Sequence, residues 1–173
     1  MKRLLTATLL ILLLAANAFA TDGTVTQSLD VVSNGIARVT FVCTGGSSGT
    51  IPNTVMSAST YNYLTKSNNP WWLYEVTAYP TSGGTAPDAA SVFVLETGTG
   101  LYLLGSEDGG TTAYNGLNLI HATLSRSCFP NMYIPRAGIH KDYFAPVKNN
   151  ITLIVADQAT ASANWTVVFT FVQ

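Results

Sequence analysis

The alternation of apolar and polar residues is most regular in residues 164–172, close to the C-terminal end. An extended chain there carries four large apolar side chains on one side: Trp165, Val167, Phe169 and Phe171. The other side carries Thr166, Val168 and Thr170. We therefore predict a strand with one buried face. Residues 150–156 are apolar on both sides, which predicts a strand in mid-sheet with a second layer close by.

Runs rich in β-branched and aromatic residues recur along the rest of the chain, at residues 24–32, 36–43, 55–65, 71–79, 91–97 and 101–104. Asn34 and Gly35 separate the first two runs, and this pair is a strong signal for a tight β-hairpin. Helical spacing occurs only in residues 117–124. Because an isolated hairpin is marginal in water, the runs must pack together. We predict an all-β fold, an antiparallel β-sandwich of jelly-roll or immunoglobulin-like type.

The first twenty residues have the order of a secretory signal peptide. Lys2 and Arg3 give a basic start, residues 4–14 are apolar, and residues 18–20 (AFA) form a small-x-small cleavage site. The apolar run is shorter than the roughly 20 residues that a membrane span needs. The alternatives are a retained N-terminal anchor or an internal helix. We predict a signal peptide at residues 1–20 and one β-sandwich domain at residues 21–173, exported to the periplasm or the extracellular space.

Cleavage would change the charge of the chain. Removing 20 of the 173 residues leaves 153, enough for one domain with a sizeable core. Without Lys2 and Arg3, 6 basic residues face 9 acidic ones, a formal net charge of −3. Nucleic-acid binding needs a basic surface, so we expect no nucleic-acid partner. Only 10% of residues are charged, against an average of about 25%, which is common in exported β-proteins and in assemblies whose surfaces neighbours cover.

Two cysteines, Cys43 and Cys128, form the only pair available for a disulfide. An oxidising compartment would permit the bridge. The alternative is two buried free thiols, which pack as small apolar groups.

The run at residues 71–79 carries the aromatic residues that we regard as candidate partner contacts. Strict alternation places Trp71 and Tyr79 on the same face. Exposed aromatic side chains can stack on sugars or fill a partner's pocket. The alternative is that both faces of this run are covered within the sandwich.

The sequence offers few groups for catalysis. His121 and His140 fit no recognised metal-ligand spacing, and Glu107 with Asp108 lacks the alternating oxygen ligands of a calcium loop. No serine lies in the Gly-x-Ser-x-Gly pattern of a nucleophile elbow. The Gly-rich residues 44–50 lack the lysine of a phosphate-binding loop and are predicted to be a flexible connection. We predict no enzyme activity, no cofactor and no metal site.

Four short segments in the middle of the chain carry a resemblance: residues 73–80 (LYEVTAYP), 85–88 (TAPD), 92–96 (VFVLE) and 100–105 (GLYLLG). In this order, and with the closing hairpin at residues 152–171, the chain resembles small β-sandwich virion proteins of tailed bacteriophages and prophages. The resemblance implies a structural protein of a capsid or tail, which associates with itself or with other structural proteins.

Two functions from different classes therefore remain. The first is a non-enzymatic structural or assembly protein, a capsid decoration or tail component, as the resemblance implies. The alternative is a secreted or periplasmic bacterial β-sandwich that binds a glycan or a cell-surface partner through the face of Trp71 and Tyr79. Neither reading involves a membrane once the signal peptide is removed.

Overall fold

The computed structural model describes residues 22–66, 68–104, 117–121, 126–128, 130–134, 139–142, 145–156 and 158–173. The predicted signal peptide and the acidic pair Glu107 and Asp108 lie outside the described residues. Among the described residues, no helix is long and apolar enough to cross a membrane.

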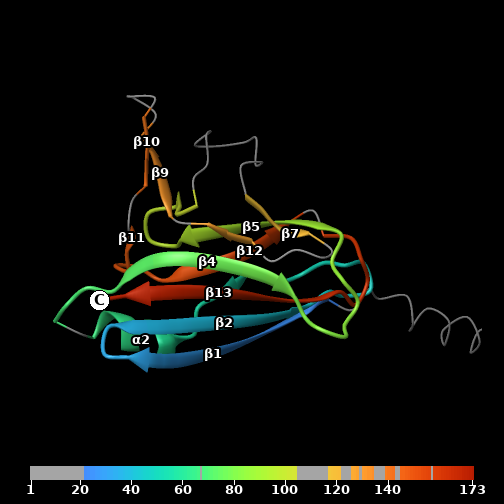
Figure 1. Ribbon diagram of the computed structural model, residues 1–173, viewed down its shortest axis with the longest axis horizontal. Coiled ribbons are helices and arrows are strands. Elements are labelled where there is room, and N and C mark those ends of the chain that lie inside the picture. Colours follow the sequence, from blue (N-terminus) through green and yellow to red (C-terminus); the bar gives the residue numbers. More distant parts are fainter. Residues whose placement is uncertain are drawn as a thin grey trace, which may run out of the picture.

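Two antiparallel β-sheets pack on each other, so the predicted all-β sandwich is confirmed (Figure 1). Sheet A has the order β1-β2-β13-β4, with two short strands on the far side of β4. Its strands are β1 (Thr24–Ser33), β2 (Ile36–Thr44), β13 (Asn164–Val172), β4 (Trp72–Pro80), β8 (Arg126–Cys128) and β11 (Ala145–Pro146).

Sheet B has the order β3-β12-β5-β6, and β7 also pairs with β5. Its strands are β3 (Thr54–Val55), β12 (Ile151–Ala156), β5 (Ala89–Glu96), β6 (Leu101–Tyr102) and β7 (Leu117–His121). A separate hairpin joins β9 (Asn131–Ile134) and β10 (Ile139–Asp142). The one described helix, α2 (Ala58–Thr65), lies at one end of the sandwich (Figure 1).

Strand β13 is the centre of sheet A because β2 and β4 pair with it on either side along its whole length. The four apolar side chains predicted to be buried, Trp165, Val167, Phe169 and Phe171, are fully buried. The ring centroids of Phe41 and Phe169 are 4.8 Å apart, within the range of favourable aromatic pairs. The prediction of a core strand at this position is confirmed.

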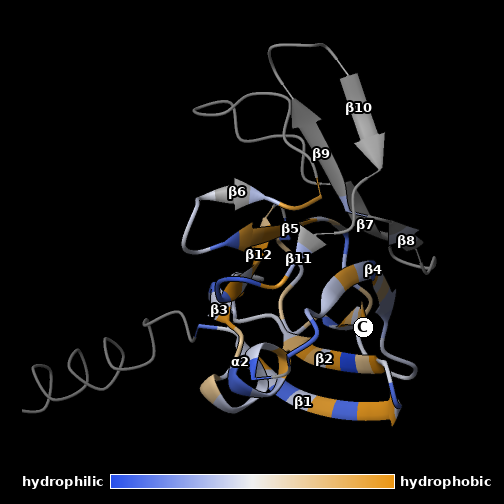
Figure 2. Cartoon of the chain, turned by 90° about the vertical axis from the view of Figure 1, so that its left-hand side faces the viewer, coloured by the Kyte–Doolittle hydropathy of each residue, from blue (hydrophilic) through white to orange (hydrophobic). Residues whose placement is uncertain are grey.

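The predicted hairpin at Asn34 and Gly35 is confirmed. Ser33 pairs with Ile36, and Gly35 has a φ of 103°, a value that a residue with a Cβ atom rarely adopts. Figure 2 shows hydrophobic and hydrophilic residues interspersed along β1 and β2. The buried positions of β2 are Ala37, Val39, Phe41 and Cys43, which belong to the core between the sheets. One irregularity near the turn, between Val31 and Ser33, ends the regular part of β1.

The predicted strand at residues 55–65 is wrong for most of its length. Only Thr54–Val55 pairs as a strand, and Ala58–Thr65 is α2. The side chain of Ser57 accepts a hydrogen bond from the backbone N–H of Thr60, which satisfies one of the free donors of the first turn. Burial of Leu64 against the core then holds the helix in place.

The helical spacing in residues 117–124 does not correspond to a helix in residues 117–121, the part of this segment that the structure describes. Residues Leu117–His121 form β7, which pairs with β5. Pairing with a sheet edge supplies hydrogen bonds that such a short segment would lack as a single helical turn.

The Gly-rich residues 44–50 are a packed turn rather than a flexible loop. Gly45 N–H donates to the carbonyl of Ala163 (2.8 Å), and Gly46 N–H donates to the carbonyl of Thr50 (3.0 Å). Gly45, Gly46 and Gly49 are buried. The glycines therefore serve close backbone packing at this end of the sandwich.

The side chain of Gln27 links the β1 edge of sheet A to the β3 edge of sheet B. Gln27 on β1 donates through Nε2 to the carbonyl of Val55 on β3 (2.8 Å). Its Oε1 accepts from the backbone N–H of Ser57, directly before α2 (2.9 Å). These two bonds fix the middle of β1 relative to sheet B.

Candidate contact surface

A β-bulge at Tyr74 changes which side chains of β4 face outward. Opposite β4, Thr170 pairs with Glu75 while Phe171 pairs with Leu73, so Tyr74 is the extra residue of the bulge. Leu73 and Val76 both face the core as a result. The strict alternation expected for residues 71–79 therefore breaks after Leu73.

Trp71 is a core residue, which contradicts its predicted role as a partner contact. It precedes β4 and is 3% exposed, with its ring centroid 5.9 Å from that of Tyr63. Its carbonyl also accepts a hydrogen bond from the backbone N–H of Val147 (2.8 Å). Removing Trp71 would damage the fold before it affected any partner.

Tyr79 keeps the exposure that was predicted for it, at 36%. It lies on the solvent side of sheet A, opposite Thr166. Trp71 and Tyr79 thus do not form one surface. Any contact site that includes Tyr79 consists of its neighbours on the solvent side of sheet A.

We call the solvent side of sheet A the outer face. The register aligns its side chains in rows across four strands. The three central rows are Thr26–Val42–Thr166–Tyr79, Ser28–Thr40–Val168–Thr77 and Asp30–Arg38–Thr170–Glu75. Within the first row, Thr166 is buried between its exposed neighbours Val42 and Tyr79. The second row continues to β8, where the Thr77 hydroxyl donates to the Ser127 hydroxyl (3.4 Å). Hydroxyl and branched aliphatic groups thus dominate the outer face.

Within the three central rows, charge is confined to one row, where Asp30 on β1, Arg38 on β2 and Glu75 on β4 are aligned across the sheet. Exposed apolar side chains occur on either side of that row. They are Ile36, Val42, Tyr74 and Tyr79. The alternation in residues 36–43 already placed Val42 on the side opposite Phe41, and this was the signal for an exposed apolar residue.

The two cysteines lie apart in sheet A. Cys43 on β2 is a free, buried thiol. Cys128 on β8 is aligned with Val76, and β13 and β4 separate the two strands. Three strand spacings amount to about 14 Å, twice the roughly 7 Å that a disulfide spans between Cα atoms. Of the two alternatives for Cys43, the structure has the free thiol, and burial raises its pKa from 9.0 to about 12.

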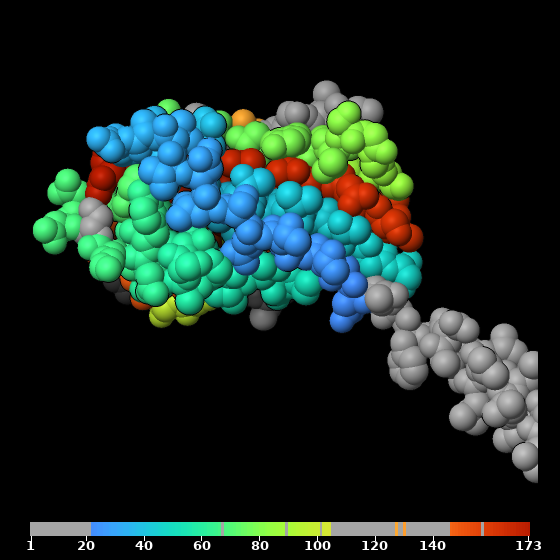
Figure 3. All heavy atoms as spheres, turned by 90° about the horizontal axis from the view of Figure 1, so that it is seen from below, coloured from blue at the N-terminus to red at the C-terminus, as the bar shows by residue number. Residues whose placement is uncertain are grey.

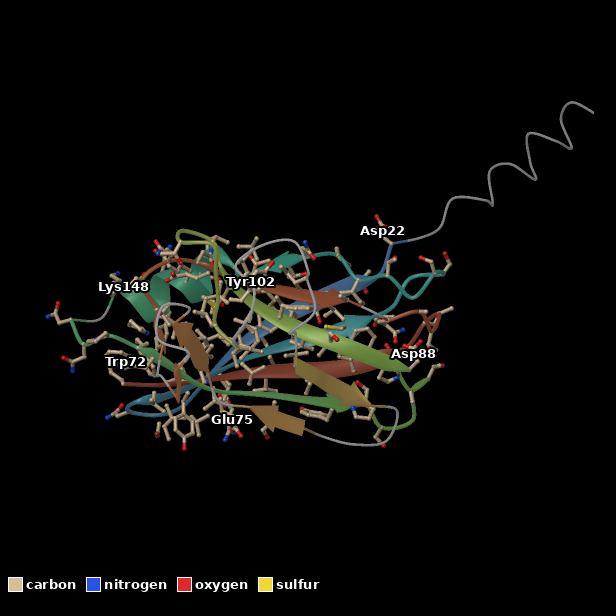
Figure 4. All side chains as sticks on the ribbon, turned by 90° about the horizontal axis from the view of Figure 1, so that it is seen from above. Asp22, Trp72, Glu75, Asp88, Tyr102 and Lys148 are labelled. Carbon is tan, nitrogen blue, oxygen red and sulfur yellow. The ribbon has the colours of Figure 1, made fainter. Side chains whose placement is uncertain are left out.

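The structure places the two histidines in separate elements. His121 ends β7 and is aligned with Ala89 in sheet B, whereas His140 belongs to the β9–β10 hairpin. Within the described residues, no three histidine, cysteine or acidic side chains gather in a manner that could hold a metal ion. The acidic side chains of Asp22, Glu75 and Asp88 lie far apart and do not point toward one another (Figure 4).

Comparisons of the chain with protein-family models, with curated proteins and with solved structures found no match.

Proposed function

We propose that this protein is a non-enzymatic structural or assembly protein that works by contact through the outer face of sheet A, like the phage capsid or tail β-sandwich proteins that it resembles. The composition of that face is the observation that supports the proposal. Interface cores are depleted of charged residues and enriched in tyrosine and tryptophan. Outside the row of Asp30, Arg38 and Glu75, the three central rows of the outer face carry no charge, and Val42 and Tyr79 are exposed on either side of Thr166.

A face of hydroxyl and aliphatic groups is suited to burial against another protein. Burying a charge without a partner costs far more free energy than burying a hydroxyl that finds a hydrogen bond. Few charges need to be desolvated here, because Asp30, Arg38 and Glu75 share one row. Association through this face should therefore respond little to salt, which screens charges.

The test measures self-association of the mature chain by sedimentation velocity and electron microscopy, at low and high salt. Val42→Lys places a charge in the middle of the outer face and should weaken association at least tenfold, without changing the melting temperature. Ser82→Lys adds the same charge to an exposed loop and serves as the matched control. Equal association by both variants, or a chain that remains monomeric at every concentration, would contradict the proposal.

Exposed aromatic side chains on β4 favour a second candidate function. Tyr74 and Tyr79 both expose part of their rings, and aromatic faces stack on sugars. A glycan-binding protein would retain oligosaccharides on a glycan array, and Tyr79→Ala would abolish the signal with folding intact. No signal from any glycan class would remove this candidate.

A further inference from the structure

Strand β1 differs from the other edge strands of the sandwich. It has ten residues and, among the residues that the structure describes, pairs on one side only, with β2. The other strands at sheet edges in the described part of the chain are short: β3, β6 and β11 have two residues, β8 has three, β9 and β10 have four and β7 has five. Shortening is a common protection against unwanted strand pairing, and β1 lacks it.

Other protections are also missing from β1. The strand contains no proline and no lysine, and Asp30 is its only charged residue. A bulge interrupts it only at its last residues, after Val31. Figure 3 shows the atoms of β1 uncovered on the underside of the molecule. Alternate backbone N–H and C=O groups of such a strand point away from the sheet, ready to pair.

Apolar side chains along this edge are incompletely covered. Val31 faces inward, opposite the fully buried Ala37, yet it is 46% exposed. Val25 and Leu29 are only partly buried, and Val55 beside the edge is exposed. Gln27 meanwhile holds the strand in place through its bonds to Val55 and Ser57. A rigid edge loses little conformational freedom on binding.

We propose that two copies of this chain pair through their β1 strands, antiparallel and about a two-fold axis, so that two copies of sheet A become one continuous sheet. The inference rests on the proposed function, for which it names the partner and the element. A second copy is the favoured occupant because the regular part of the strand, Val25 to Val31, is self-complementary.

The register follows from the centre of that regular part, Ser28. With Ser28 opposite itself, Val25 lies opposite the partner's Val31 and covers its exposed side chain. Asp30 lies opposite the partner's Thr26, so the two Asp30 carboxylates stay apart. The outer faces of both copies then lie on the same side and form a single, wider contact surface.

Cross-linking of the mature chain tests this register. Residues directly opposite in an antiparallel pair have Cα atoms about 4.5–5.5 Å apart, within disulfide range. Ser28→Cys should therefore form a disulfide-linked dimer under mild oxidation, visible on a non-reducing gel. Thr24→Cys is the matched control: it lies on the same side of the same strand, but its partner copy would be roughly 27 Å away. The unmodified chain gives the background from Cys43 and Cys128.

A second variant tests the pairing without a cysteine. Ser28→Lys places two like charges opposite each other at the two-fold axis and should weaken dimerisation by roughly threefold or more. Thr24→Lys, away from the axis, should not. Sedimentation velocity measures both, and an unchanged melting temperature shows that folding is intact.

The outcomes separate this inference from the proposed function. Strong cross-linking at position 28 and none at 24 supports the β1 pairing. Equal cross-linking at both positions, or none at 28, overturns it. If copies still associate in that case and Val42→Lys still disrupts them, the outer-face proposal stands and only the edge pairing fails.

Discussion

Phe169 is fully buried on β13, the central strand of sheet A. Its ring lies 4.8 Å from that of Phe41 and 6.5 Å from that of Phe171, measured between centroids. Phe169→Ala should lower the free energy of unfolding by about 3–5 kcal/mol, because it removes buried apolar surface and leaves a cavity. Urea denaturation measures the change. Thr170→Ala, one position on and facing solvent, is the control and should cost less than about 1 kcal/mol.

Gly49 and Gly83 both have a backbone conformation that favours glycine, but only Gly49 also lacks the space for a Cβ atom. Both have positive φ, at 79° and 78°. A Cβ atom added to Gly49 would lie 2.4 Å from the carbonyl carbon of Ala159, whereas one added to Gly83 would meet nothing within 4 Å. Gly83→Ala should therefore cost about 1 kcal/mol from backbone strain alone.

The cost of Gly49→Ala should exceed that of Gly83→Ala by roughly 1–3 kcal/mol, since backbone atoms must move apart. Thermal unfolding of the two variants gives the comparison. Equal losses would show that the turn at residues 44–50 yields without cost.

The buried thiol of Cys43 should make the free energy of unfolding depend on pH in the alkaline range. Burial raises the pKa of its thiol from 9.0 to about 12, so the unfolded chain loses this proton at lower pH than the folded chain. The folded protein therefore loses stability as the pH rises from 9 to 12, by about 1.4 kcal/mol per pH unit. Below pH 9 the full stability is present.

The measurement compares the free energy of unfolding at pH 8 and pH 10. Between these values, the unmodified chain should lose about 1.4 kcal/mol more than Cys43→Ala, which has no thiol at this position. The two proteins are identical at every other position, so the difference between their pH profiles isolates Cys43. Identical pH profiles would mean that the thiol is accessible to water.

Residues whose burial follows strict alternation were predictable, and those next to the bulge were not. Phe169 and its neighbours on β13 are buried as the pattern indicates. On β4, the extra residue Tyr74 reverses the facing of every position before it relative to those after it. The sequence of residues 71–79 does not reveal the bulge, because aromatic residues fall on both faces of the strand whether or not a residue is inserted. The role assigned to Trp71 failed for this reason.

At the scale of elements, Gln27 connects β1 to sheet B. It makes hydrogen bonds of 2.8 and 2.9 Å with backbone groups that precede α2. Gln27→Ala should cost about 1–2 kcal/mol, because it removes two hydrogen bonds that each contribute roughly 0.5–1.5 kcal/mol. Amide hydrogen exchange should also become faster at Ser57, whose N–H donates to Gln27. Ser28→Ala, on the exposed side of β1, is the control for both readouts.

Elements were predictable where they are long and regular. The β1–β2 hairpin and β13 follow directly from Asn34-Gly35 and from alternation. Helix α2 has only eight residues, and its threonine and tyrosine residues favour strands. The cap at Ser57 was the available signal, but it lacks the acidic residue that would complete a capping box. The packing of Leu64 against the core stabilises the helix, and this contact cannot be inferred from the sequence.

At the scale of the whole molecule, the clearest prediction concerns the mature N-terminus. Ala18 and Ala20 are the small residues that signal cleavage requires, so protein purified from its native host should begin at Thr21. Intact mass spectrometry checks this directly. Ala20→Pro should block cleavage, and the longer chain should then remain with the membrane fraction. An intact Met1 on the exported protein would contradict the prediction.

The position of β13 has a consequence for when the protein can fold. β13 follows every other strand in the chain, yet it lies between β2 and β4 at the centre of sheet A. The side chains of Thr44 and Asn164, which join β2 to β13, are 120 positions apart. Contacts over such separations form slowly. A nascent chain that has not reached residue 164 keeps β2 and β4 unpaired at their inner edges, so sheet A cannot close until residues 164–172 have been synthesised.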